Sequence, residues 1–184
     1  MVGLVLFLTL SSPDCNTTSF NVEKTDGIRY VYFTKELNGE CILDGLWTEY
    51  FIEGNKVRSQ GYYKNNSKQG HWFWNYRTGS KQMQGGFKDD VEEGYWIFFH
   101  RNGRRFMEGS YCSGFQCGQW LMSDEEGNLY AKSMWSKGHI EGELTYYHTN
   151  GKKKMLGQMK DGKRSGHWIW WNEKGEVEKE ESYK

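Results

Sequence analysis

Five histidines are the residues of this sequence best suited to bind a metal ion or to transfer protons. His71 and His167 each follow a recurring glycine by one residue, whereas His100 and His148 follow it by six. None of them has the spacing of a helical zinc motif such as H-E-x-x-H. Equivalent residues on a sheet of repeated hairpins lie about 10 Å apart, too far for shared coordination or a proton relay. We therefore interpret the histidines as polar surface residues.

The stretch GQMKDGKRS at residues 157–165 comes close to the phosphate-binding pattern G-x4-G-K-[ST]. That pattern needs a hydroxyl at its last position and a glycine loop between a strand and a helix. Here Arg164 stands at the hydroxyl position, and both glycines belong to the repeat described below. Because no nucleophile stands beside a base elsewhere, the sequence predicts no enzyme, no metal site and no cofactor.

Four cysteines are able to pair if the protein is exported. Cys112 and Cys117 flank four residues of a predicted hairpin, so a disulfide bond could cross it, and Cys15 and Cys41 would then remain. Spacing alone establishes neither pairing. The absence of a C-x-x-C pair argues against zinc and against a redox site.

The composition fits one β-rich domain. The chain has 184 residues, of which 17% are aromatic and 23 are glycine, but only one is proline. This balance favours extended strands joined by glycine turns, because proline removes a hydrogen-bond donor from a sheet. The 24 basic residues are matched by 24 acidic ones, so we do not expect a nucleic acid partner.

Glycines recur with a period of 24 residues, apart from a first step of 25, over most of the chain. A second glycine follows each starting glycine by nine residues. From Gly70 onward a third precedes it by nine, except at Ser133. Together these columns contain most of the glycines. The units start at Gly45, Gly70, Gly94, Gly118, Gly142 and Gly166.

Turns and apolar columns show that each unit is one β-hairpin. Pairs such as Asn65-Asn66 and Asp161-Gly162 fit two-residue hairpin turns, since these residue types adopt positive φ at low cost. Side chains two residues apart on a strand share a face. The residues two positions after each starting glycine therefore form an inward packing column, with Leu144 as the exception: Trp47, Trp72, Trp96, Trp120 and Trp168.

The sequence thus predicts an all-β protein: an antiparallel sheet of about six stacked 24-residue hairpins, spanning about 60 Å. Residues 45–184 form the repeat domain, and 13–44 form an N-terminal segment with a capping strand or degenerate unit at 28–33. At the other end, the charged residues expected to blunt the edge strand are Glu176, Glu178, Lys179, Glu180 and Glu181.

Residues 1–12 are expected to be a signal peptide. The apolar run from Val2 to Leu10 suits its central region and is too short to span a bilayer, which needs roughly 20 residues. A buried N-terminal strand is the alternative, and Cys15 raises the further alternative of a lipid anchor, although Pro13 and Asp14 fit that poorly. The sequence therefore predicts a secreted, periplasmic or envelope-associated protein.

The unit G-x-W-x-[YFW]-x4-G followed by G-x-[YFW]-x-x-[DNG]-G resembles the MORN repeat in its bacterial variant form, over residues 45–184. Leu144 and Ser133 depart from the pattern, and the period is one residue longer than usual. The resemblance implies an elongated, twisted antiparallel sheet. It also implies a scaffold, a protein-binding module or a membrane-associated adaptor, and some relatives carry an antitoxin label.

Two surfaces are candidates for binding a partner. Aromatic residues that point away from the packing column could stack on sugar rings or on a partner chain: Tyr50, Tyr76, Phe99, Tyr147 and Trp171. A basic ladder eleven residues after the starting glycine could meet anionic lipid or an acidic partner: Lys56, Lys81, Arg105 and Lys153, supported by Arg104, Lys152 and Lys154. A solvated strand face is the alternative for the ladder, because Leu129 and Val177 interrupt it.

The expected function is that of a non-enzymatic scaffold presenting a repeated surface to another protein. A glycan- or cell-wall-binding repeat is the alternative, although such repeats favour adjacent Gly-Trp pairs and shorter periods. A third alternative is an antitoxin-like partner of a toxin.

Overall fold

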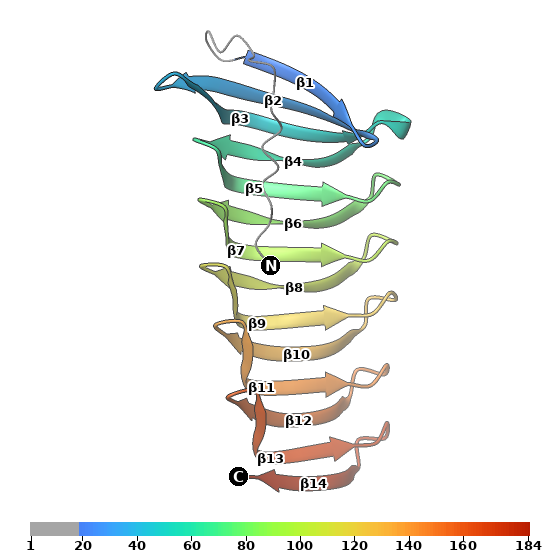
Figure 1. Cartoon of the computed structure of the whole chain (residues 1–184). Helices are drawn as coiled ribbons and strands as arrows, with labels where there is room; N and C mark the ends of the chain where they lie inside the picture. The colour runs from blue at the N-terminus through green and yellow to red at the C-terminus, as the bar shows by residue number, and fades with distance from the viewer. Residues whose placement is uncertain (1–18) are drawn as a thin grey trace.

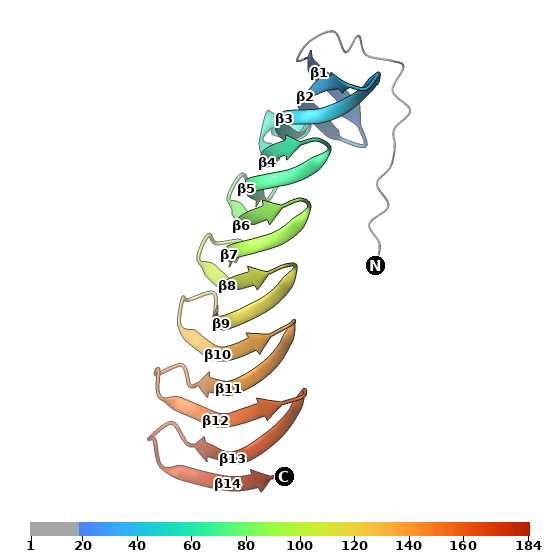
Figure 2. The ribbon, with the colours of Figure 1, turned by 90° about the vertical axis from the view of Figure 1, so that its left-hand side faces the viewer.

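The computed structural model describes residues 19–184 as a single antiparallel sheet of 14 strands. Each strand pairs with its neighbours in sequence, so the chain runs through the sheet like a ladder (Figure 1). The strands are visibly curved in the orthogonal view (Figure 2). The predicted all-β, elongated sheet of hairpins is therefore confirmed.

The strands have similar lengths, apart from two longer ones near the N-terminus. They are β1 (Ser19–Thr25), β2 (Ile28–Leu37), β3 (Glu40–Phe51), β4 (Val57–Lys64), β5 (Ser67–Asn75), β6 (Lys81–Lys88), β7 (Val91–Phe99), β8 (Arg105–Cys112), β9 (Phe115–Ser123), β10 (Leu129–Ser136), β11 (His139–Tyr147), β12 (Lys153–Lys160), β13 (Lys163–Trp171) and β14 (Val177–Tyr183). A short 3-10 helix, η1 (Glu53–Asn55), follows β3.

The sheet has two different long sides. On one side, which we call the turn edge, two-residue turns join the strands at 65–66, 89–90, 113–114, 137–138 and 161–162. Both residues of each turn have positive φ, for example 50° at Asn65 and 67° at Asn66, as the sequence predicts. On the other side, the loop edge, longer loops centred on the second glycine column join the strands (Figure 1).

The starting glycines lie inside strands and do not begin them. Gly70 is in β5 with φ of 65°, at the place where the pairing register shifts between Gln60 and Tyr62 of β4. A positive φ at an extra residue produces a bulge that bends the strand. The starting glycines therefore act as bulges within the strands.

The predicted tryptophan column forms the core of one face, which we call the aromatic face. Trp72, Trp96, Trp120 and Trp168 are 0–3% exposed. Rings make edge and stacked contacts from strand to strand, such as Trp72 with Tyr63 at 5.2 Å and Trp96 with Phe87 at 5.3 Å between centroids. This geometry is the one that aromatic pairs favour.

The third glycine column makes this packing possible. A Cβ atom added at Gly85 would lie 2.0 Å from Trp96 Cδ2, and Gly61, Gly109 and Gly157 have the same relation to the tryptophan that covers them. Each indole ring therefore lies directly on the glycine of the preceding strand.

The two departures from the repeat meet at one joint between units. Ser133 of β10 is paired in register with Leu144 of β11, and both are buried. Here the smaller Leu144 replaces the ring, and Ser133 has the Cβ that a ring would exclude. Ser133 Oγ also accepts a hydrogen bond from Trp135 Nε1 at 2.8 Å. The two exceptions are thus one matched pair.

The N-terminal segment continues the same sheet. Residues 28–33 belong to the ten-residue strand β2, and the expected boundary at residue 45 falls inside β3. Tyr32 is 4% exposed and stacks on Trp47 with ring centroids 5.1 Å apart, closing the aromatic core at this end. The expected signal peptide at 1–12 and Cys15 lie outside the described residues.

At the C-terminal end, β14 pairs only with β13, as expected for the charged edge strand. The stretch from 19 to 184 contains no helix with the length and apolar character needed to cross a bilayer.

Candidate functional site

The two predicted binding sets meet beside the loop edge. Phe99 is directly opposite Arg105, and Tyr147 is directly opposite Lys153, each across neighbouring strands. All four lie next to a loop, because each pair is the last one before the loop that joins its two strands. The register therefore places an aromatic and a basic candidate opposite each other in the units that start at Gly94 and Gly142.

Hydrogen bonds place two members of the basic ladder on the face opposite the aromatic face. Arg105 Nη1 donates to Glu108 Oε2 at 2.6 Å, and Lys81 Nζ donates to Gln84 Oε1 at 2.6 Å. Glu108 pairs in register with Ile97, one position away from the buried Trp96 and hence on the other side of the pleat. The arginine side chain is still 60% exposed in this ion pair.

The remaining aromatic candidates have other neighbours. Trp171 is opposite Val177, and Tyr50 is opposite Val57. The Arg29 guanidinium lies 4.2 Å from the centre of the Tyr50 ring, so this ring already has a cation within the chain.

Lys56 does not belong to the basic ladder. The first unit has one additional residue, so Val57 takes the position that Lys81 occupies in the next unit. Lys56 Nζ instead donates to the Thr78 carbonyl at 2.7 Å, in the loop of the following unit. The sequence count was one residue out of register here.

Tyr76 likewise has a role inside the fold. Its hydroxyl donates to the Phe99 carbonyl at 2.9 Å, and Arg101 lies 5.3 Å from its ring centre. Asn75 beside it donates to the Val57 carbonyl at 3.0 Å. Both residues link neighbouring units and are not available as free surface groups.

Two loops share the pattern H-x-N-G-[RK]-[RK], at 100–105 and 148–153, and use it in the same way. His100 Nε2 donates to the Ser123 carbonyl and His148 Nε2 to the Trp171 carbonyl, both at 2.8 Å. The asparagine amides donate to the carbonyls of Glu125 and Glu173.

The last residue of each of these loops completes the link. Arg104 donates to the Glu125 carbonyl at 3.0 Å, and Lys152 donates to the Lys174 carbonyl at 2.8 Å. The sequence predicts surface histidines, but His100 and His148 link neighbouring units. The recurrence of the whole pattern after 48 residues is the sequence signal for this linking role.

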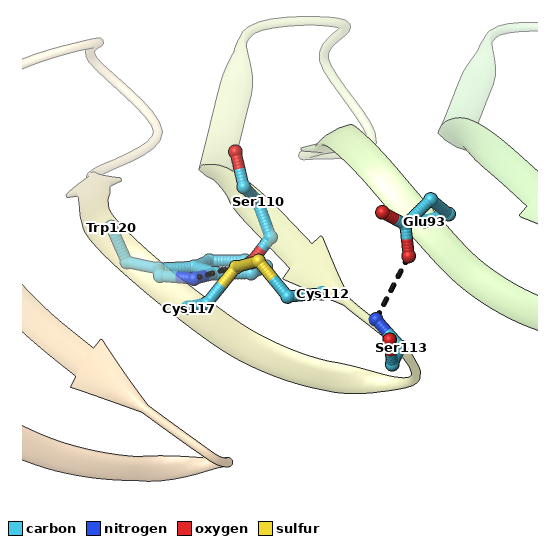
Figure 3. The surroundings of a disulfide bond; sticks show 6 residues. All are labelled: Glu93, Ser110, Cys112, Ser113, Cys117 and Trp120. Atoms are coloured by element: carbon cyan, nitrogen blue, oxygen red, sulfur yellow. Dashed lines mark hydrogen bonds between the residues drawn. A yellow bond between two sulfur atoms is a disulfide. The ribbon is translucent and has the colours of Figure 1, made fainter.

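The turn edge has its own links between units. Glu93 Oε2 accepts from the Ser113 N–H at 2.8 Å, and Glu141 Oε2 accepts from the Asp161 N–H at 3.0 Å. Cys117 occupies the equivalent position between them, but it forms a disulfide bond with Cys112 (Figure 3). Cys117 is therefore bonded within its own hairpin, whereas Glu93 and Glu141 at the same position bond to the turn of the next hairpin. Cys41 is disulfide-bonded as well.

The loop at 124–128 is also closed on itself. Asp124 accepts hydrogen bonds from the N–H groups of Glu126 and Asn128 and from the Asn128 amide. Desolvation acts to raise the pKa of the Asp124 carboxyl, but these hydrogen bonds outweigh it and hold the pKa below its ordinary value.

Burial has the opposite effect on the tyrosines of the aromatic face. Desolvation, with smaller contributions from Asp90 and Glu49, raises the pKa of Tyr63 to about 12. Desolvation, with Glu92 nearby, also raises the pKa of Tyr111. These hydroxyls therefore remain neutral at any physiological pH.

Shallow hollows lie at both edges of the sheet. A hollow of about 420 Å³ at the turn edge lies between the turns at 65–66 and 89–90. A hollow of about 350 Å³ at the loop edge is lined by Asn128, Leu129, Tyr147, Thr149, Asn150 and Gly151. Within residues 19–184, no cluster of three or more His, Cys, Asp or Glu side chains is placed to hold a metal ion.

Comparisons with known proteins assign no function to the chain. The chain matches no family model and no curated protein. Solved structures that match include a GtfA/B complex bound to UDP and GlcNAc, which is 10% identical, covers 95% of this chain and has a TM-score of 0.19. The chain spans about a quarter of that protein's chain. A TM-score this low supports no argument about function.

Proposed function

We propose that the protein is a non-enzymatic scaffold whose loop edge binds an extended segment of another protein. The observation that supports this is the register of the two candidate sets, Phe99 with Arg105 and Tyr147 with Lys153. Aromatic residues and arginine are enriched in protein interfaces and among the residues that contribute most to binding.

The spacing of these pairs suits an extended acidic segment. Two strands of a sheet advance it by about 10 Å, so Arg105 and Lys153, four strands apart, are roughly 20 Å from each other. An extended peptide rises about 3.3 Å per residue, so acidic residues about six positions apart would reach both cations. The continuous hydrogen-bonded sheet from β8 to β12 holds this spacing, which limits the entropy lost on binding.

Charge reversal on matched edges tests the proposal. The immobilised full chain is used to capture proteins from the producing cell, alongside Arg105→Glu/Lys153→Glu and the turn-edge control Lys88→Glu/Lys160→Glu. We expect a protein that is retained by the wild type and the control but lost by the loop-edge variant. Its purified form should then bind the variant at least tenfold more weakly in calorimetry.

Removal of the rings should have the same effect. Tyr147→Ala/Trp171→Ala is expected to weaken the same complex without changing the melting temperature by more than a few degrees. Equal capture by all variants would contradict the proposal. Selective binding to purified cell wall, to a glycan array or to anionic vesicles would instead favour a glycan-binding or membrane-associated protein.

A further inference from the structure

The joint between the loops at 124–128 and 148–152 differs from the other joints along the loop edge. At three other joints a cationic side chain donates to a carbonyl of the next loop: Lys56 to Thr78, Arg104 to Glu125 and Lys152 to Lys174. At a fourth, Arg101 lies over the ring of Tyr76. A lysine or arginine thus lies between the loops in each case.

Asn128 stands where Arg104 and Lys152 stand in the neighbouring units. Its short amide donates to Asp124 Oδ2 within its own loop and does not extend to the next one. Asp124, in the position of His100 and His148, is also fully engaged with its own loop. Neither residue links the 124–128 loop to the loop that follows.

The 350 Å³ hollow lies at this joint. Thr149 and Asn150, on its far side, correspond to the residues whose carbonyls accept the cationic donors elsewhere. Among residues 19–184, no side chain donates to either of these two carbonyls. The hollow thus has the acceptors of a cation site and the space for one long side chain.

Other lining groups suit the same occupant. The Tyr147 ring provides a face for a guanidinium or an alkyl stem. Glu125 and Glu126 are exposed on the adjoining loop and contribute negative charge. The ammonium of Lys152 is directed to the next joint, where Lys174 accepts it. Lys153, opposite Tyr147, is the nearby charge that opposes binding.

We propose that this hollow binds a lysine or arginine side chain supplied by the partner protein. The site deepens the interaction function proposed above and rests on it for the identity of the ligand as part of a protein. The partner segment would then carry acidic residues that contact Arg105 and Lys153, and one basic residue that enters the hollow.

A titration with small cations tests the hollow without any partner. The probe is N-acetylargininamide, with the neutral isostere N-acetylcitrullinamide as control, and the readout is amide NMR shifts of the full chain. We expect saturable shifts at Asn128 and at 149–151 with the arginine probe, and at least tenfold weaker binding of the citrulline probe. Absence of saturation, or equal binding of both probes, would overturn the proposal.

The second test uses a variant in which the protein's own side chain fills the hollow with a cation. Asn128→Lys should place its own ammonium between the loops, as Lys152 does, and weaken probe binding at least tenfold. Asn128→Gln, neutral and of intermediate length, should keep it. If Asn128→Lys binds the probe like the wild type, the proposal is wrong. Probe binding without any captured partner would support the hollow while contradicting the scaffold function, so the two failures are distinguishable.

Discussion

At the residue scale, an indole ring can lie flat on the neighbouring strand only where that strand lacks a Cβ atom. Gly61, Gly85, Gly109 and Gly157 provide this space, and none of them needs glycine for its backbone angles. Their requirement is steric, which separates them from the glycines of the turns and bulges. The two groups should therefore respond differently to alanine.

Gly85→Ala is expected to destabilise the protein by about 3 kcal/mol, because the new methyl group would overlap the buried Trp96 ring. Gly103→Ala is the control. Gly103 has a φ of 87° and no neighbouring atom within 4 Å, so alanine there should cost only about 1 kcal/mol of backbone strain. Urea unfolding of both variants measures the difference. Similar costs at the two sites would contradict this account of the glycine column.

The buried tyrosines predict a loss of stability at alkaline pH. Below pH 10 the Tyr63 hydroxyl is neutral in both the folded and unfolded states. Between pH 10 and 12 the unfolded chain ionises while the folded state, with its pKa of about 12, stays neutral, so stability falls as pH rises. Tyr111 acts in the same direction. Melting temperatures between pH 9 and 12 should show the fall.

Tyr63→Phe identifies the source of that effect. It removes one ionisable group and keeps the ring, so the melting temperature should fall less steeply above pH 10 than in the wild type. Identical slopes would show that Tyr63 does not titrate as the structure implies.

At the scale of the elements, the joint between β10 and β11 tests whether the glycine–tryptophan pair is one unit. Leu144→Trp alone should cost about 1–3 kcal/mol, because the ring would meet the Cβ of Ser133. Ser133→Gly alone loses the hydrogen bond from Trp135, at a cost of about 1 kcal/mol. The double variant should be more stable than the sum of the two changes implies.

A double-mutant cycle measured by urea unfolding gives this coupling directly, and we expect at least about 1 kcal/mol in favour of the double variant. Thr48→Val, distant from the joint, serves as an uncoupled partner for Leu144→Trp. Simple additivity at residues 133 and 144 would mean that the two exceptions arose independently of packing.

Hairpins, turns and the aromatic face were predictable because each depends on one residue type at one position of a repeat. Turn pairs such as Asn65-Asn66 and the Trp72 column are examples, and the structure confirms both. The bulge at Gly70 was not predictable, because a glycine with positive φ within a strand resembles a turn glycine in sequence.

The candidate site was predictable only in part. The register that brings Arg105 opposite Phe99 depends on a second bulge beside each loop, which no residue type marks. Lys56 fell out of register because a single additional residue precedes it. His100 and Tyr76 appeared to be surface residues because the carbonyls to which they donate lie 23 residues away, in another unit.

At the scale of the whole molecule, each strand of the ladder forms backbone hydrogen bonds only with its neighbours. Ring contacts such as Trp74 with Trp96 reach the strand after next, so stability is a sum of local terms. The joint around β10 and β11 lacks the loop link, the carboxylate link at the turn edge and the indole ring. We therefore expect the amides of β10 and β11 to exchange at least tenfold faster than those of β6 and β7.

Hydrogen exchange followed by mass spectrometry measures this pattern. The Ser133→Gly/Leu144→Trp variant is the matched comparison, and it should reduce the difference between the two regions. Uniform protection from β4 to β13 would contradict the idea of a weaker joint and would indicate that the backbone ladder alone sets local stability.

The seating of an indole on the preceding glycine also makes the length of the protein adjustable. Excision of residues 70–93 would bring Trp96 over Gly61, a contact equivalent to the one removed. Excision of residues 118–141 would instead bring Leu144 over Gly109, and the smaller side chain would leave part of the space of the Trp120 ring empty. Most repeat units are therefore interchangeable in length and contact, so the sheet can be shortened by whole units. The exception is the joint between Ser133 and Leu144, whose packing fits only itself.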